Sequence, residues 1–101
     1  MKTGIELIAE ERQRQIEVEG FTAIRDTLYA NEELAKAAVS YALPKQYKLI
    51  NRYGQMLPII PEYWPWHHSW WKPSPNDRVR ELVKAGALIA AEIDRLQAKT
   101  Q

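Results

Sequence analysis

The sequence predicts an all-α fold, a small helical bundle with a long C-terminal helix and a long loop rich in proline and tryptophan. Three observations lead to this class. Apolar residues recur at spacings of three and four in two segments, which is typical of helices with one buried face. Residues that start and stop helices flank these segments. Between them, five prolines from Pro44 to Pro73 exclude any long regular element.

The first helix is predicted over residues 4–19. Thr3 and Glu6 have the spacing of a capping box, and Gly20 follows as a stop residue. The surface of this segment is heavily charged. Its narrow apolar side consists of Ile5, Ile8 and Ile16. We expect residues 21–30 to be a connection.

The second helix is predicted over residues 32–43, with Asn31 as its N-cap and Pro44 ending it. Its apolar face is Leu34, Ala38, Tyr41 and Ala42. A short helix over residues 45–52 is expected next. Residues 54–73 are then an irregular loop, and loops of more than about 12–15 residues are often lids or binding loops.

The last helix is predicted over residues 75–98, with Ser74 as N-cap and Pro75 at the first helical position. It spans roughly 35 Å at about 1.5 Å per residue. Its apolar residues follow a heptad seam: Val79, Leu82, Gly86, Ile89, Ile93 and Leu96. Small residues beside the seam leave room for another helix to approach closely.

Length and composition narrow the class of protein. A chain of 101 residues is expected to form a single helical domain, 1–101, with a thin core. Small domains commonly compensate for a thin core by oligomerisation, so a homo-oligomer is expected. A net charge of +1 argues against a protein that coats extended nucleic acid. The absence of cysteine excludes disulfides and thiolate metal sites. No signal-peptide core or membrane-length apolar run is found, so a cytoplasmic protein without a membrane partner is expected.

Residues 63–73 contain every tryptophan of the chain, Trp64, Trp66, Trp70 and Trp71. Exposing so much apolar surface costs about 25 cal/mol per Å². Most of these rings are therefore expected to pack on the helices as a substitute core. One or two could instead stack on a planar base, which is worth about 1–3 kcal/mol per base. His67 is expected to be a hydrogen-bonding loop residue beside them.

Lys84 is the one charged or polar side chain between Leu82 and Ala91. It falls on the side of the helix opposite the heptad seam, where its neighbours are apolar, so it is expected in a partly enclosed place. Its ammonium could reach water along its stem, or pair with Glu81 one turn earlier. The alternative is that it binds a phosphate or another anion.

Two helices carry an acid followed by a lysine three residues later, Glu33 with Lys36 and Glu81 with Lys84. Glu32 and Lys36 also have the spacing of a helix-stabilising ion pair. The functional interpretation is that these acids and lysines face a shared polar cleft.

Several blocks of the sequence resemble a group of small phage and prophage proteins. The blocks cover most of the chain: Glu11-Arg12-Gln13-Arg14-Gln15-Ile16, Glu33-Leu34-Ala35, Trp64-Pro65-Trp66, Trp70-Trp71-Lys72-Pro73 and Leu82-Val83-Lys84-Ala85-Gly86-Ala87-Leu88-Ile89. This group is distantly similar to the MazG-like all-α NTP pyrophosphatases, which are commonly dimeric or tetrameric. The resemblance implies Mg²⁺ held by Glu-Glu-x-x-Glu and Glu-x-x-Asp motifs.

The sequence departs from those two motifs at two places and from the phage group at a third. The last acid of the first motif falls on Lys36, and the aspartate of the second falls on Lys84. Where the phage group carries His-Asp-Asp, this chain has Arg25-Asp26-Thr27. Mg²⁺ prefers hard oxygen ligands, so each lysine removes a ligand and adds a like charge. The resemblance and the substitutions together imply a site that binds a nucleotide without cleaving it.

These observations lead to three alternative functions. The first is non-catalytic binding, without cofactor, of a nucleotide or nucleotide-derived signal, which a phage protein would sequester in the host cytoplasm against a defence system. Its predicted site residues are Lys36, Lys84, Arg14, Glu33, Glu81, His67, Trp64, Trp66, Trp70 and Trp71. The second is a Mg²⁺-dependent pyrophosphatase with Glu32, Glu33, Glu81 and Asp77 as ligands. The third is a protein-interaction module that docks its aromatic loop on a host protein.

Overall fold

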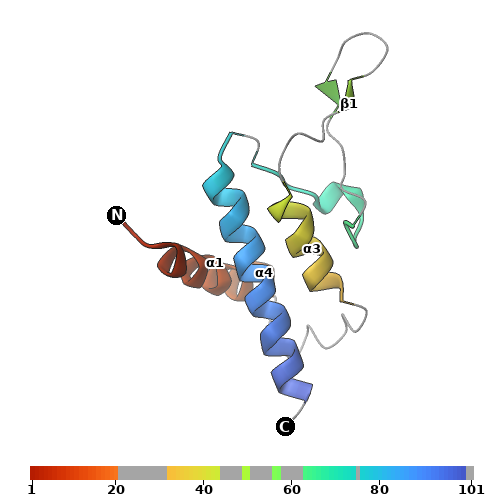
Figure 1. Ribbon diagram of the computed structural model, residues 1–101. Helices are drawn as coiled ribbons and strands as arrows, with labels where there is room; N and C mark the ends of the chain where they lie inside the picture. Colours follow the sequence, from red (N-terminus) through yellow and green to blue (C-terminus); the bar gives the residue numbers. More distant parts are fainter. Residues whose placement is uncertain (21–31, 44–48, 51–55, 58–62, 75, 100–101) are drawn as a thin grey trace.

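The computed structural model describes residues 1–20, 32–43, 49–50, 56–57, 63–74 and 76–99. Its fold is all-α, as predicted, and the described helices are α1 (Gly4–Glu19), α3 (Glu33–Ala42) and the long α4 (Arg78–Lys99). A 3₁₀ turn, η1 (His68–Trp70), and two short strands, β1 (Leu49–Ile50) and β2 (Met56–Leu57), complete the described elements. Figure 1 shows α4 between α1 and α3. Both shorter helices pack on α4, and within the described parts they do not pack on each other.

Helix α1 has the predicted bounds, because its start and stop signals are local. The Glu6 amide donates to Thr3 Oγ1 at 3.2 Å, and the Thr3 amide donates to Glu6 Oε1 at 3.0 Å. Gly20 ends the helix with a φ of 73°, a left-handed conformation that favours glycine. The predicted apolar side is wrong for Ile5, which is 83% exposed. The buried residues of α1 are all polar: Glu11, Arg12 and Gln15.

Helix α3 is anchored at its C-terminal end by a residue from another helix. The Arg78 guanidinium donates to the carbonyls of Tyr41 and Leu43 at 3.2 and 3.0 Å, and also to that of Ala42. At the other end the N-cap is Glu32, which has a φ of 67° and makes no side-chain capping bond. The predicted cap, Asn31, lies outside the described residues, as does the predicted connection over 21–30.

Helix α4 begins at Arg78, three residues later than predicted. Asp77 caps it, since Asp77 Oδ1 accepts a hydrogen bond from the Arg80 amide at 3.0 Å. The carbonyl of Ser74 accepts from the Asp77 amide at 3.0 Å, so Ser74 belongs to the turn before the helix. The prediction of Ser74 as the N-cap is therefore wrong, because the better-placed carboxylate of Asp77 takes this role.

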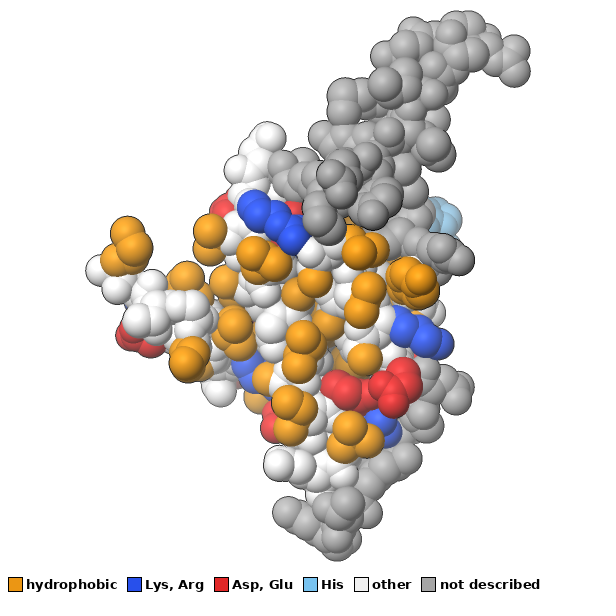
Figure 2. Space-filling model, viewed as in Figure 1, with side chains coloured by type: hydrophobic (Ala, Val, Ile, Leu, Met, Phe, Trp, Pro, Cys, Tyr) orange, Lys and Arg blue, Asp and Glu red, His pale blue; other side chains and the backbone are white. Residues whose placement is uncertain are grey.

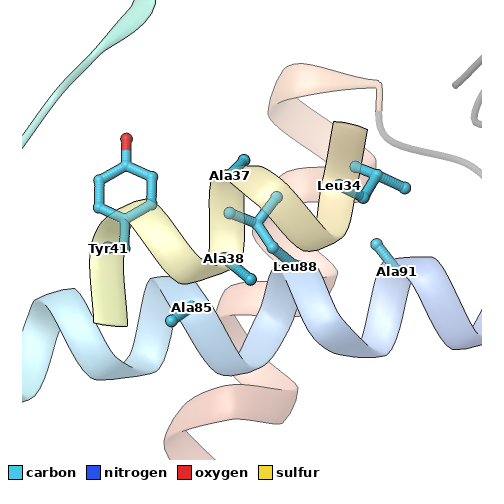
Figure 3. Close-up of a cluster of buried hydrophobic side chains, with 7 residues drawn as sticks. All are labelled: Leu34, Ala37, Ala38, Tyr41, Ala85, Leu88 and Ala91. Atoms are coloured by element: carbon cyan, nitrogen blue, oxygen red, sulfur yellow. The ribbon is translucent and has the colours of Figure 1, made fainter. Parts of the chain in front are cut away.

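The apolar core lies between α3 and α4. It consists of Leu34, Ala37, Ala38, Tyr41, Ala85, Leu88 and Ala91. Figure 3 shows Leu34 and Ala91 at one end of this cluster and Tyr41 and Ala85 at the other. The two helices therefore run antiparallel. Most of these residues are alanines, so the helix axes approach closely and each large side chain is enclosed.

The large side chains of the heptad seam of α4 face neither α1 nor α3, whereas at Gly86 the seam is covered by the Ile8 side chain of α1. These large side chains are exposed in this chain, with fractions from 45% for Leu96 to 60% for Val79. Figure 2 shows hydrophobic side chains gathered along α4 on the face toward the viewer. Helix α3 packs on another side of α4, where Ala85, Leu88 and Ala91 allow close approach.

The segment between α3 and α4 is less irregular than predicted. Strands β1 and β2 pair antiparallel, with Leu49 opposite Leu57 and Ile50 opposite Met56. The predicted helix over 45–52 is thus wrong at Leu49 and Ile50, where pairing with β2 outweighs the helical spacing. The predicted loop over 54–73 likewise contains β2 and η1. None of the described helices is long and apolar enough to cross a membrane.

Candidate functional site

A cleft of ≈ 390 Å³ lies between α1, the aromatic segment 63–73 and α4. This volume is in the usual range of small-molecule pockets, about 300–1,000 Å³. Five of the predicted site residues line it: Arg14, Lys84, Trp64, Trp66 and Trp70. They are joined by Glu11, Gln15, Glu19, Tyr41, Lys72, Arg80 and Leu88. The cleft therefore combines aromatic rings with charged groups of both signs.

The aromatic wall of the cleft is built on Tyr41 of α3. Trp71 stacks on Tyr41 with ring centroids 4.6 Å apart, and Trp64 meets the same ring edge-on at 5.7 Å. The Trp64 indole Nε1 donates to the His67 carbonyl at 3.0 Å, which fixes its orientation. Trp64, Trp66 and Trp71 all pack against the core. The prediction that most of these rings form a substitute core is confirmed for these three.

Trp70 differs from the other three tryptophans. It is 53% exposed and lies tilted against Trp66, with centroids 6.5 Å apart. Because it lines the cleft and is not held in the core, it can offer a ring face to a ligand. Three of the four indoles therefore pack against the core, and the ring of Trp70 is accessible to a ligand.

Lys84 is held in a fixed position at the cleft. Its ammonium donates to the Lys72 carbonyl at 2.8 Å and to Ser74 Oγ at 3.1 Å, and it lies 5.4 Å from the centre of the Tyr41 ring. Partial burial, and then the nearby charge of Arg80, lower the pKa of Lys84. An ammonium has three N–H donors, so one remains for a ligand. The prediction of a partly enclosed lysine is confirmed.

A carboxylate shared by two arginines forms the floor between α1 and α4. Glu11, whose side chain is 1% exposed, receives two hydrogen bonds of 2.8 Å from Arg14 and pairs with Arg80 at 2.8 Å. Burial raises the pKa of Glu11, but the bonds from Arg14 and the charge of Arg80 outweigh it, and the net shift is downward. Arg14 also pairs with Glu19 at 3.2 Å. Arg14 is therefore already engaged by two carboxylates.

The charges lining the cleft are unbalanced. Four cations, Arg14, Lys72, Arg80 and Lys84, stand against two carboxylates, Glu11 and Glu19, which leaves a net charge of +2. The molecule as a whole carries only +1. The cleft is thus the place where an anion is attracted.

Gln15 is a cleft residue that the sequence analysis missed. It is 3% exposed, and its Nε2 lies 3.5 Å from Glu11 Oε2. No group among the described residues donates to its buried Oε1, which is costly unless a ligand or water supplies a donor. The signal available in the sequence was its position one turn after Glu11. Lys72, Arg80 and Tyr41 were missed as well, because the packing of separate elements brings them together.

The other predicted site residues lie apart from the cleft. Lys36 is exposed on α3 and does not line it. Glu81 is buried, accepts from the Ser74 amide at 3.2 Å and pairs with Arg78 at 3.6 Å. His67 caps η1, with its Nδ1 accepting from the Ser69 amide at 3.1 Å, in agreement with the hydrogen-bonding role predicted for it.

The predicted meeting of the two acid–lysine pairs is not observed. Antiparallel packing places the N-terminal end of α3 beside the C-terminal half of α4. There the hydrogen bond with Glu92 raises the pKa of Arg95, and the charges of Glu32 and Glu33 add to this shift. Glu81 lies by the other end of α3, next to Arg78. Over the described ranges no three histidine, aspartate or glutamate side chains come together as a metal site. The Arg25-Asp26-Thr27 stretch lies outside those ranges.

Comparison of the chain with protein-family models, curated proteins and solved structures gave no match. The resemblance to the phage group and to the MazG-like enzymes stays a prediction from the sequence. The case for a function rests on the cleft itself.

Proposed function

We propose that the cleft binds a nucleotide or a nucleotide-derived signal without cleaving it. The observation that carries this proposal is that one cleft combines an available indole face, Trp70, with an anchored cation, Lys84. A planar base and an anionic phosphate are the two parts of a nucleotide that such a pair recognises.

The base would stack on Trp70 and meet Gln15. Stacking is sequence-tolerant and is worth about 1–3 kcal/mol. The buried Oε1 of Gln15 needs a hydrogen-bond donor, and the N–H edge of a base supplies one. This gives the site a preference for bases that present a donor.

The phosphate would be bound by Lys84 and Lys72. Lys84 has one donor left after its bonds to the Lys72 carbonyl and Ser74 Oγ. Lys72 lines the same cleft and its side chain is exposed. Arg14 and Arg80 contribute to the positive field but are already bonded to Glu11, so their role is secondary.

Binding without hydrolysis is supported by the state of the acids at the cleft. Glu11 is bonded to two arginines, and Glu19 is paired with Arg14. A carboxylate neutralised in this way is a poor ligand for Mg²⁺ and a poor general base.

The setting of this binding is inferred from the sequence resemblance. We propose that a phage-type protein in the host cytoplasm sequesters the nucleotide, which would oppose a defence system that signals through it. The protein would act by its affinity and concentration, because each molecule holds its ligand without turning it over.

Calorimetry in metal-free buffer tests the proposal, with ATP, GTP, cyclic AMP and a cyclic dinucleotide as ligands. We expect at least one to bind, and Lys84→Met to weaken it by about tenfold or more, which corresponds to about 1.4 kcal/mol. Lys36→Met is the matched control, since Lys36 lies on the exposed side of α3 outside the cleft. We expect ligand binding to change the tryptophan fluorescence of the natural chain. Trp70→Ala should weaken binding and remove this change.

Two results would contradict the proposal. One is the absence of binding for every ligand at millimolar concentration, and the other is equal weakening by Lys84→Met and Lys36→Met. Release of pyrophosphate from nucleoside triphosphates in the presence of Mg²⁺, abolished by EDTA, would instead favour the pyrophosphatase.

A further inference from the structure

A second hollow, the α1–α4 groove, lies beside the cleft and shares a wall with it. Its volume is ≈ 320 Å³, close to the ≈ 390 Å³ of the cleft. Three residues line both hollows: Glu11, Arg14 and Arg80. Because the hollows meet at the same side chains, one ligand can occupy both.

The α1–α4 groove differs from the cleft in the chemistry of its lining. The residues that line the groove but not the cleft are Leu7, Glu10, Asp77, Val79 and Val83. Three of them are apolar and two are acids, whereas the cleft carries an excess of cations. The groove therefore suits a group with an apolar face and hydrogen-bond donors, and it repels phosphate.

The two acids of the groove can each accept further hydrogen bonds. Glu10 pairs with Lys2, and Asp77 Oδ1 accepts from the Arg80 amide at 3.0 Å. An ionised carboxylate has about four acceptor positions and no donor. Hydroxyl and amino groups of a ligand can therefore donate to both acids.

Arg80 is the cation at the crossing between the two hollows. It pairs with Glu11 through Nη1 at 2.8 Å, and its side chain is 37% exposed. A guanidinium has five N–H donors, so donors remain for a ligand. Lys84 follows one turn later on α4, and after the larger effect of burial the charge of Arg80 lowers the pKa of Lys84. An anion bound beside both cations would relieve this repulsion.

Building on the nucleotide-binding function proposed above, we infer that the cleft and the α1–α4 groove together bind one dinucleotide, two nucleosides joined through phosphate. The first base stacks on Trp70 in the cleft, and the linking phosphate lies by Lys84 and Arg80. The second nucleoside enters the groove, where its base covers the apolar side chains. Its ribose hydroxyls donate to the groove acids, since carboxylates commonly bind ribose in this way.

The order of charges along the two hollows distinguishes a dinucleotide from other phosphate ligands. A nucleoside triphosphate with its base in the cleft would direct its outer phosphates toward Glu10 and Asp77, which repel them. Two separate mononucleotides would need two phosphate sites, but Arg14 is already bonded to two carboxylates. A dinucleotide instead places its shared linkage at Arg80, which both hollows reach.

Calorimetry in metal-free buffer tests the inference by comparing ligands that carry the same base. The mononucleotides AMP and GMP are compared with the linear dinucleotides pApA and pGpG and with cyclic di-AMP and cyclic di-GMP. At least one dinucleotide should bind as one molecule per chain. Its affinity should exceed that of the matching mononucleotide by about tenfold or more, because the second nucleoside binds as part of the same ligand.

Val79→Glu tests the part played by the groove. Val79 is 60% exposed and lines the groove but not the cleft, so the helical content by circular dichroism should not change. The larger, charged side chain should remove most of the difference in affinity between dinucleotide and mononucleotide. Ile93→Glu is the matched control, since it adds the same charge to α4 at a position that is 50% exposed and outside both hollows. It should keep the difference.

The results separate this inference from the function on which it rests. Equal affinity for mononucleotides and dinucleotides, two mononucleotides bound per chain, or an unchanged difference in Val79→Glu would overturn the inference. Mononucleotide binding that still depends on Lys84 would then leave the proposed function standing. Absence of binding for every nucleotide would contradict both.

Discussion

At the scale of single residues, Glu32 has the least favourable backbone conformation of the described part of the chain. Its φ of 67° is the one positive value at a residue other than glycine among the described residues. A left-handed conformation costs an ordinary L-residue roughly 1–2 kcal/mol. Glu32 also makes no side-chain bond to the start of α3. The residue therefore costs stability without capping the helix.

Glu32→Asn should raise the free energy of unfolding by about 0.5–1 kcal/mol, because asparagine tolerates positive φ better than glutamate. Urea denaturation followed by circular dichroism measures the change. Glu33→Asn removes the same charge one residue later, at a helical φ, and should lower stability slightly through its helix propensity. Equal effects of the two substitutions would show that charge, not backbone conformation, governs this position.

At the scale of elements, the C-terminal end of α3 is held by a single guanidinium. Helix C-termini leave carbonyls without partners. Arg78, the first residue of α4, donates to three of them, on Tyr41, Ala42 and Leu43. This arrangement fixes the end of α3 against the start of α4, and it also positions Tyr41, the base of the aromatic wall.

Arg78→Met should lower the free energy of unfolding by about 1–3 kcal/mol, since it removes charge-assisted hydrogen bonds and a favourable cation at a helix end. Arg78→Lys should recover only part of this loss, because a lysine reaches fewer of the three carbonyls. Thermal unfolding of the natural chain and of the two variants measures the order of their stabilities. A lysine variant as stable as the natural chain would show that the positive charge alone is sufficient.

At the scale of the whole molecule, the buried residues that attach α1 to the rest of the fold are polar: Glu11, Arg12 and Gln15. Glu11 pairs with Arg80, and Arg12 pairs with Asp94 at 3.1 Å. The Ile8 side chain also packs over Gly86, beside these pairs. Because its buried residues are polar, α1 depends on their ionisation for its place in the fold.

Acid should therefore detach α1 before it unfolds the rest. The pKa of Glu11 is lower in the folded state than in the unfolded chain, so its contribution is fully present above about pH 4.5 and is lost as the pH falls through its lower folded value. Glu11→Gln should lower stability by about 2–3 kcal/mol at pH 7 and flatten the acid limb of the stability curve. Denaturant titrations from pH 7 to pH 3 measure both effects. An unchanged acid limb in the variant would assign acid sensitivity to other carboxylates.

How much could be predicted from the sequence depended on whether the cause was local. The capping box of Thr3 and Glu6 and the stop at Gly20 act within one turn, so the bounds of α1 could be predicted. Lys84 could be found because a lone cation in an apolar run needs an explanation. Ser74 was the wrong cap because Asp77, three residues later, competes for the same role.

The remaining features depend on how elements pack. The heptad pattern identified the apolar row of α4 but could not say that its large side chains are exposed, that α1 covers Gly86 and that α3 packs on another side of the helix. Gln15 and Arg80 became cleft residues only because α1 crosses α4 at Glu11. Lys36 was predicted from a motif alignment, and the antiparallel packing of α3 places it elsewhere.

The polar attachment of α1 has a further consequence for anything that enters the cleft. Glu11, Arg14, Gln15 and Glu19 all belong to α1, so one wall of the cleft exists only while this helix is docked. If a fraction of molecules has α1 undocked, the apparent affinity falls in proportion to the docked population. Salt screens the ion pairs that hold α1 as well as the attraction of an anion to the cleft, so ionic strength would act on occupancy twice.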